Sequence, residues 1–166
     1  LEILRAMDVP FVLIDRKVDG SGYSYVGSDN ESGAYDAVRL LISEGKKRIG
    51  FIGGNLNVSS GAERYSGYLR ALADAGFSCG ADYAEITQKH SIERGAECAR
   101  ALLERKVDAI FVSDNTLTMG AVIELNRQHI SIPDQVSIIG YDNFDWMDLM
   151  TPPLTTVKQQ AYQMGY

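Results

Sequence analysis

Apolar residues along this chain form continuous runs and helical stripes, and the two patterns alternate. Short apolar runs bounded by turn-forming residues are typical of strands buried on both faces of a sheet. Such runs cover residues 9–14, 49–52, 108–112 and 136–140. Shorter strands are predicted at 23–26 and 84–86, and one more is predicted to follow the proline pair at 152–153.

Helical stripes fill the stretches between these runs. Ala34, Val38 and Leu41 recur at spacings of three and four residues, which places them on one face of a helix. After Ser91, a predicted helix cap, the same spacing predicts an inner helix face made of Ile92, Ala96, Ala99 and Leu103. Strands that alternate with helices in this way predict a parallel, doubly wound α/β architecture.

Helix starts carry capping signals. Ser28–Glu31 and Ser60–Glu63 both match the capping box, in which a serine and a glutamate three residues later satisfy free backbone donors. Asp29, inside the first box, is also an expected cap. The Pro152-Pro153 pair cannot lie inside a helix or a central strand, so it marks a crossing between structural units.

Composition narrows the function classes. The chain has 166 residues, 45% of them hydrophobic, and a formal net charge of −6, which argues against this piece being a nucleic-acid-binding surface. Cys79 and Cys98 have neither metal-ligand spacing nor the density of a disulfide framework, so a reducing cytoplasm is expected. No apolar run has the length of a membrane span, and no contact with a membrane is expected. Both ends of the chain fall inside predicted helices, the first over residues 2–7, so we expect a segment of a longer protein.

Polar residues gather where predicted strands end. In open α/β sheets the ligand lies outside the carboxyl ends of the strands, so residues there are the candidates for binding. They are Asp15, Ser60, Arg64, His90, Asp114, Asp142 and Trp146. Carboxylates accept hydrogen bonds from hydroxyls, a guanidinium donates, and an indole ring covers the C–H face of a sugar. The set therefore favours a hydroxyl-rich ligand.

Structural roles compete with this interpretation. Each aspartate could simply cap the helix that follows it, and a tryptophan belongs to the core more often than to a ligand site. Arg64 could be a surface cation, although a cation in the first turn opposes the helix dipole and so suggests a specific partner. No nucleophile elbow, paired histidines or phosphate-binding glycine loop is present, so neither an enzyme, a metal site nor a cofactor is predicted.

Several motifs, taken in order, resemble those of lactose-repressor/galactose-repressor (LacI/GalR) type transcriptional regulators. They lie at 9–16, 45–54, 64–68, 109–112, 132–134, 136–142 and 153–157, and the resemblance extends over nearly the whole chain. It implies the effector-binding core of such a regulator, with a periplasmic-binding-protein-like fold of two doubly wound parallel-sheet lobes joined by crossovers. The implied division is residues 1–27 in an incomplete amino-terminal lobe, 28–153 in the carboxyl-terminal lobe, and 154–166 in the return crossover and the first lobe.

The same resemblance implies function. A sugar-like effector would bind in the cleft between the lobes, and the full-length protein would be a cytoplasmic homodimer that binds operator DNA through a helix-turn-helix domain absent from this chain. The resemblance places the cleft at the residues already named, with Arg64 and Asp142 in intact motifs. It departs at Asp114-Asn115, where the family commonly has Asn-Asp, and at His90, where many members have a large aromatic residue.

Two other functions stay open from the sequence. A periplasmic sugar-binding protein of a transporter would have the same fold. An α/β enzyme could use Asp114 and Asp142 as an acid/base pair.

Overall fold

The computed structural model describes residues 3, 9–18, 20–77 and 80–166. Its larger sheet is parallel, with the strand order β4-β3-β5-β6-β7. These strands are β3 (Ile49–Gly53), β4 (Ala84–Ile86), β5 (Ala109–Val112), β6 (Ser137–Tyr141) and β7 (Thr155–Val157). The helices are α2 (Asn30–Ser43), α3 (Ser59–Asp74), α4 (Ile92–Glu104), α5 (Asn115–Arg127) and α6 (Ala161–Gly165), with 3-10 turns η1 (Gly80–Tyr83) and η2 (Asp145–Leu149). Cys79 and, apart from Ile3, the predicted helix over 2–7 lie outside the described residues.

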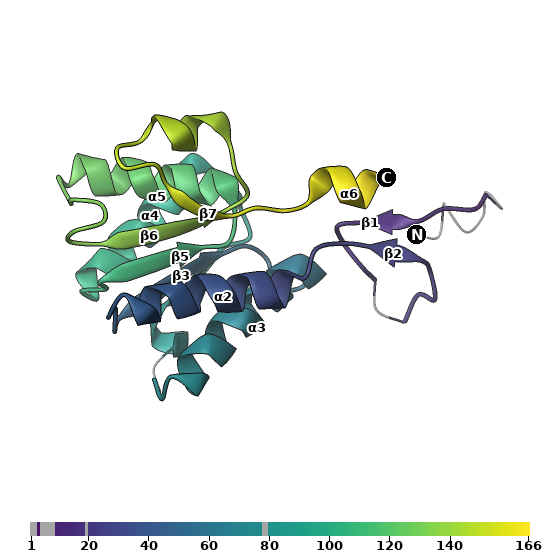
Figure 1. Cartoon of the computed structure of the whole chain (residues 1–166), viewed down its shortest axis with the longest axis horizontal. Helices are drawn as coiled ribbons and strands as arrows, with labels where there is room; N and C mark the ends of the chain where they lie inside the picture. The colour runs from purple at the N-terminus through teal and green to yellow at the C-terminus, as the bar shows by residue number, and fades with distance from the viewer. Residues whose placement is uncertain (1–2, 4–8, 19, 78–79) are drawn as a thin grey trace.

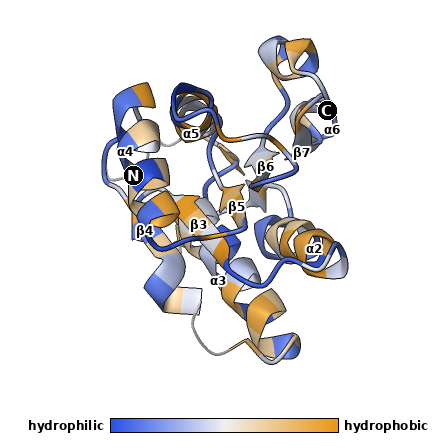
Figure 2. Ribbon diagram, turned by 90° about the vertical axis from the view of Figure 1, so that its left-hand side faces the viewer, coloured by the Kyte–Doolittle hydropathy of each residue, from blue (hydrophilic) through white to orange (hydrophobic). Residues whose placement is uncertain are grey.

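Helices cover both faces of this sheet, which confirms the doubly wound parallel α/β architecture. Figure 2 shows α4 and α5 on one side of the hydrophobic strands and α2 and α3 on the other. Neighbouring strand residues point to opposite faces, so Ile110 and Val112 pack against α4 and α5 while Phe111 packs against α2 and α3. Continuous apolar runs are therefore needed here, since both faces of each central strand are buried.

A second, two-stranded parallel sheet lies beyond the carboxyl ends of the larger one. It pairs β1 (Leu13–Ile14) with β2 (Tyr25–Val26), and Figure 1 shows it on the same side of the larger sheet as α6. Both strands are shorter than the predicted runs over 9–14 and 23–26. The chain returns towards this sheet after β7.

The position of β7 corrects one boundary. We predicted that the return crossover starts at residue 154, directly after the carboxyl-terminal lobe. Instead, Thr155–Val157 pairs with β6 as the edge strand of the larger sheet, so the chain leaves that sheet only after Val157. The reason is that Thr156 and Val157 find backbone partners beside Gly140 and Tyr141. The division into two lobes stays a prediction.

Two capping boxes are wrong and two caps are confirmed. Helix α2 is capped by Asp29, whose carboxylate accepts from Ser32 N, while the Ser28 hydroxyl donates to Gln159. Helix α3 follows Val58 without a side-chain cap. Ser91 caps α4 by accepting from Arg94 N, as predicted.

The buried face of α4 differs from the predicted stripe. Ile92 is 37% exposed, whereas Cys98 and Leu102 are buried with Ala99 in the core. Compared with the predicted inner face, α4 is rotated about its axis, because Gly95 lies directly against the backbone of α5. This contact decides which residues of α4 face inward.

Helices α4 and α5 are also joined by a bidentate ion pair. Arg100 Nε and Nη2 donate to the two oxygens of Glu124 at 2.8 and 3.1 Å, and Gln128 donates to Glu124 at 2.7 Å. Glu124 is 3% exposed. The hydrogen bonds from Arg100 and then Gln128 lower the pKa of its carboxyl group, against the opposing effect of burial.

The Glu124 carboxylate should make the stability of the fold sensitive to acid. The pKa of Glu124 is lower in the folded state than its ordinary value of 4.5, so the ionised side chain stabilises the fold at pH values above 4.5. This stabilisation is lost as the pH falls through the pKa of the folded state. Urea unfolding between pH 7 and pH 3 should show a smaller loss of unfolding free energy below pH 4.5 in Glu124→Gln than in the wild type. The exposed-site control Glu44→Gln should follow the wild-type curve. An unchanged acid slope in Glu124→Gln would contradict this assignment.

Within the described part of the chain, no helix is long and apolar enough to cross a membrane.

Candidate ligand-binding site

A cavity of about 330 Å³ lies at the carboxyl ends of the strands. Its lining comes from both sheets, since Asp15 and Arg16 follow β1, Gly54 and Asn55 follow β3, and Ser113 and Asp114 follow β5. In the larger sheet the strand order reverses at β3, whose neighbours β4 and β5 are reached in opposite directions. Open α/β sheets form their ligand crevices at such a switch point, because the following loops diverge there.

Six of the seven predicted ligand residues line this cavity. They are Asp15, Ser60, Arg64, His90, Asp114 and Asp142. Trp146, in η2, is not among them and instead packs, partly buried, against the core cluster that contains Met147 and Leu154. The structure therefore does not support Trp146 as a ligand platform, because η2 carries the ring back onto the core.

The carboxylates of Asp15 and Asp142 are placed by unusual backbone conformations. Their φ angles are +69° and +66°, in the left-handed region that costs a residue with a Cβ about 1–2 kcal/mol. Neither residue caps a helix; each turns the chain sharply at the end of a strand and brings its side chain to the cavity. Strained positions of this kind are frequent at functional sites.

Asp142 is held in place by the segment that follows β7. Gln159 Nε2 donates to Asp142 Oδ1 at 2.6 Å, and the Gln159 amide oxygen accepts from the Ser28 hydroxyl at 2.9 Å. Asp142 is thus tied to both connections between the two sheets. Gln159 was not among the predicted ligand residues, although its place just after the strand predicted to follow the proline pair could have indicated it.

Arg64 is the buried charged side chain of the cavity, with 8% of its surface exposed. Its Nη1 donates to the carbonyl of Ser113 at 2.7 Å, its Nε donates to Asn30 at 2.9 Å, and its guanidinium lies 3.6 Å from the ring centroid of Tyr141. Burial raises the pKa of the Tyr141 phenol while the neighbouring Arg64 opposes the rise, so the phenol stays neutral and can donate. The surface-cation interpretation of Arg64 is therefore wrong.

Asp114 caps a helix and also lines the cavity. Its Oδ1 accepts from Leu117 N at 2.9 Å and caps α5, while its Oδ2 lies 3.0 Å from His90 Nδ1 beside the cavity. His90 in turn lies against Gly54, where an added Cβ would be 2.4 Å from the imidazole ring. The loop after β4 and the start of α5 are therefore joined at the rim of the site.

The chemical character of the lining is polar. Besides the predicted residues, the polar side chains of Arg16, Asn55, Gln88 and Gln159 reach the cavity, and Val58 is its aliphatic side chain. Apart from the His90 imidazole, no aromatic ring is found among the described lining residues. Such a surface can exchange many hydrogen bonds with a ligand and offers little area for stacking.

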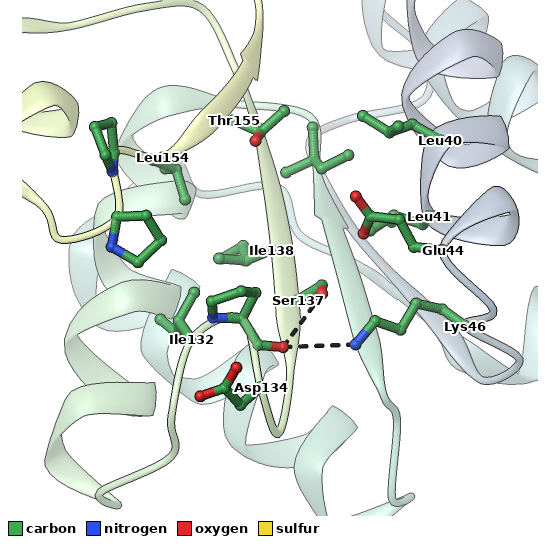
Figure 3. A pocket seen from close by; sticks show the side chains of 14 residues that line it. Leu40, Leu41, Glu44, Lys46, Ile132, Asp134, Ser137, Ile138, Leu154 and Thr155 are labelled. Atoms are coloured by element: carbon green, nitrogen blue, oxygen red, sulfur yellow. Dashed lines mark hydrogen bonds between the residues drawn. The ribbon is translucent and has the colours of Figure 1, made fainter.

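A larger cavity, of about 440 Å³, lies at the opposite end of the sheet, where β6 and β7 begin. Figure 3 shows Lys46 and Ser137 directed to one carbonyl, that of Pro133, at 3.5 and 3.3 Å. Its floor is Leu41, Ile138 and Leu154, which belong to the protein core. Its charged lining residues, Glu44, Lys46 and Asp134, are not buried, so it lacks the buried arginine that distinguishes the smaller cavity.

No group of three metal-ligating side chains is found among the residues that the structure describes.

Known proteins with similar sequences belong to a family of periplasmic binding protein-like domains and include transcriptional repressors. The family described as "Periplasmic binding protein-like domain" matches residues 38–166. The HTH-type transcriptional repressor PurR of Vibrio atlanticus is 33% identical over 171 residues, which cover 97% of this chain and 48% of that protein. The chain thus spans about half the length of the curated relatives that it matches.

Solved structures share the fold. A sugar-binding transcriptional regulator of the LacI family from Escherichia coli, solved with phosphate, has a TM-score of 0.85 and 29% identity, with 98% of this chain and 59% of that chain covered. A putative transcriptional regulator LacI from Bacillus cereus subsp. cytotoxis has a TM-score of 0.90 and 30% identity, with 99% and 59% covered.

Proposed function

This chain belongs to the periplasmic binding protein-like domain family and forms a LacI/GalR-type effector-binding core, and from this premise we propose that it is the ligand-sensing part of a bacterial transcriptional repressor. The observation that carries the proposal is one cavity that collects a buried arginine and three carboxylates at the strand ends. The full-length protein would bind operator DNA in the cytoplasm as a homodimer, through a helix-turn-helix domain outside this chain.

The proposed effector is a sugar or a similar hydroxyl-rich molecule. Asp15, Asp114 and Asp142 supply acceptors for hydroxyl hydrogens, and Arg64 supplies a charged donor. The volume of about 330 Å³ lies at the lower end of ligand pockets, which suits a small polar molecule. Ser60 and His90 complete the proposed contacts, and no catalytic residue or cofactor is proposed.

The proposed mechanism is a population shift. The cavity is lined from the smaller sheet by Asp15 and from the larger sheet by Asp142, and Gln159 joins the latter to the crossovers. A ligand that contacts both sides binds one relative arrangement of the two parts better than another. It therefore biases the arrangement of the full-length protein by that difference in affinity.

The alternatives have less support. The relatives that match nearly the whole chain are transcriptional repressors, which favours a regulator over a transporter's binding protein. An acid/base role for Asp114 and Asp142 has to compete with the bonds they already accept from Leu117 N, His90 and Gln159.

Calorimetric titration tests the proposal. The protein is titrated with D-ribose, D-glucose, D-galactose, D-fructose, lactose, adenine and hypoxanthine, and we expect at least one sugar to bind. Asp142→Asn keeps the acceptor for Gln159 but replaces the other carboxylate oxygen by a donor, so it should weaken that sugar by about 10- to 100-fold. Asp145→Asn, at an exposed position nearby, should bind like the wild type. If no sugar binds, or if Asp142→Asn binds the sugar as well as the wild type does, the proposal is wrong.

A further inference from the structure

Asn30 is a buried polar residue that the candidate ligand set does not contain. It is the first residue of α2, and only 1% of its surface is exposed. It does not line the cavity. The sequence placed it inside a capping motif, yet Asp29 performs the capping of α2, which leaves the side chain of Asn30 for another purpose.

The carboxamide of Asn30 uses every hydrogen bond it can make. Its oxygen accepts from Arg64 Nε at 2.9 Å and from the Tyr141 hydroxyl at 3.2 Å. Its nitrogen donates to Glu63 Oε2 at 3.0 Å and to the Ser28 carbonyl at 3.3 Å. An arginine Nε can only donate and a carboxylate can only accept, so the orientation of the amide is fixed by its partners.

These contacts hold Arg64 from the side that faces away from the cavity lining. With Asn30 on Nε, the Ser113 carbonyl on Nη1 and the ring of Tyr141 under the guanidinium, the plane of Arg64 is fixed at three points. A long side chain held in its binding conformation loses less entropy when a ligand arrives, which improves affinity without adding a contact. Asn30 accepts from Arg64 with its side-chain oxygen, whereas Ser113 accepts with its backbone carbonyl, so the contact with Asn30 can be removed by substitution.

The same amide is connected through Glu63 to the segment after β1. Glu63, which accepts from Asn30, forms an ion pair with Lys17 Nζ at 2.6 Å, and Lys17 N donates to Ser59 Oγ at 3.1 Å. Lys17 lies in the segment after β1, whereas Glu63 and Ser59 belong to α3. A continuous chain of polar contacts thus runs from the segment after β1 to Arg64.

We propose that Asn30 is a positioning residue, which fixes the Arg64 guanidinium for the effector and links it through Glu63 to Lys17. The positional part stands on the contacts of Asn30 alone; the effect on a ligand rests on the proposed sensing function. The two parts are therefore tested by separate measurements.

The first measurement needs no ligand. In ¹⁵N-labelled protein, the Nε–H signal of Arg64 is assigned by its loss in Arg64→Met, and the exchange of this proton with water is followed. Burial and the bond to Asn30 should make that exchange slow in the wild type. In Asn30→Leu, which keeps the approximate volume without an acceptor, exchange should accelerate about tenfold or more. Asn126→Leu, at an exposed position of α5, should leave the signal unchanged.

A second variant guards against misfolding. Asn30→Asp combined with Glu63→Gln reverses the bond between the two positions: an oxygen at position 30 still accepts from Arg64 Nε, and the amide at position 63 now donates where Glu63 accepted. Only the longer bond to the Ser28 carbonyl, at 3.3 Å, is given up. Slow exchange should persist in this pair. An unprotected Arg64 signal in the wild type, an unchanged signal in Asn30→Leu, or loss of the signal in the exchanged pair would each overturn the positioning role.

The second measurement is a double-mutant cycle with the panel sugar that binds most tightly. Asn30→Leu should weaken that sugar about tenfold in the wild-type background. In the Arg64→Met background it should have no further effect, because Asn30 acts through Arg64. Equal losses in both backgrounds would contradict positioning. If no panel sugar binds, the proposed sensing function fails, while the exchange measurement still decides whether Asn30 holds Arg64.

Discussion

The Arg64→Met variant is expected to bind the panel sugar about 100-fold more weakly than the wild type. Arg64 is the buried charged side chain of the cavity, so a ligand hydrogen bond to it is shielded from water and strengthened by charge. Removing a charged partner from such a site typically costs about 3 kcal/mol, which corresponds to that loss in affinity. Calorimetry under the conditions of the panel measures it directly.

Two matched variants define what is lost. Arg64→Lys keeps the charge but has a single donor group, which cannot reproduce the separate bonds to Asn30 and Ser113, so it should bind almost as weakly as Arg64→Met. Arg39→Met makes the same change on the exposed face of α2 and should bind normally. Wild-type affinity in Arg64→Met, in protein that unfolds cooperatively, would remove Arg64 from the binding site.

The Gly120→Ala variant is expected to lose about 2–3 kcal/mol of unfolding free energy. A Cβ on Gly120 would lie 2.1 Å from the carbonyl oxygen of Ile92 and 2.8 Å from the nitrogen of Ala96. Both atoms belong to the backbone of α4, so no side chain can rotate away and the two helices have to separate. That separation disturbs the Gly95 contact with Leu117 as well, since the helices touch there backbone to backbone.

Alanine is otherwise the better helix former by about 1 kcal/mol, so the expected loss is net of this gain. Gly165→Ala in α6 isolates the gain, because nothing lies within 4 Å of an added Cβ there, and this variant should be as stable as the wild type or slightly more so. Urea unfolding with comparison of slopes and midpoints measures both variants. A Gly120→Ala protein as stable as Gly165→Ala would show that the close approach of α4 and α5 is not needed.

Local pattern was sufficient for the order of the elements and for most of the site. Continuous apolar runs predicted the central strands, and helical spacing predicted the helices, because both patterns depend on backbone geometry over a few residues. Parallel strands bring their carboxyl ends to one edge, so residues such as Asp114 and Asp142 could be grouped from their positions after strands. The resemblance to LacI/GalR-type regulators, confirmed by the family match, pointed to the same edge.

What the sequence could not decide are the contacts between distant segments. Trp146 turns back to the core, Ser28 bonds to Gln159 131 positions away instead of capping its helix, and β7 extends the larger sheet. The rotation of α4 follows from its glycine contact with α5, which no periodicity within α4 reveals.

Asn30 and Arg64 show the division most clearly. Sequence alone predicted Arg64 in the first turn of a helix beside the strand ends, where a cation needs a specific partner, whereas the structure places it one turn further along α3, which begins at Ser59. Only the tertiary structure decided that the partners are Asn30, Ser113 and Tyr141. The physical reason is that secondary structure follows from neighbours in the chain, whereas burial and hydrogen-bond partners depend on which chain segments fold against one another.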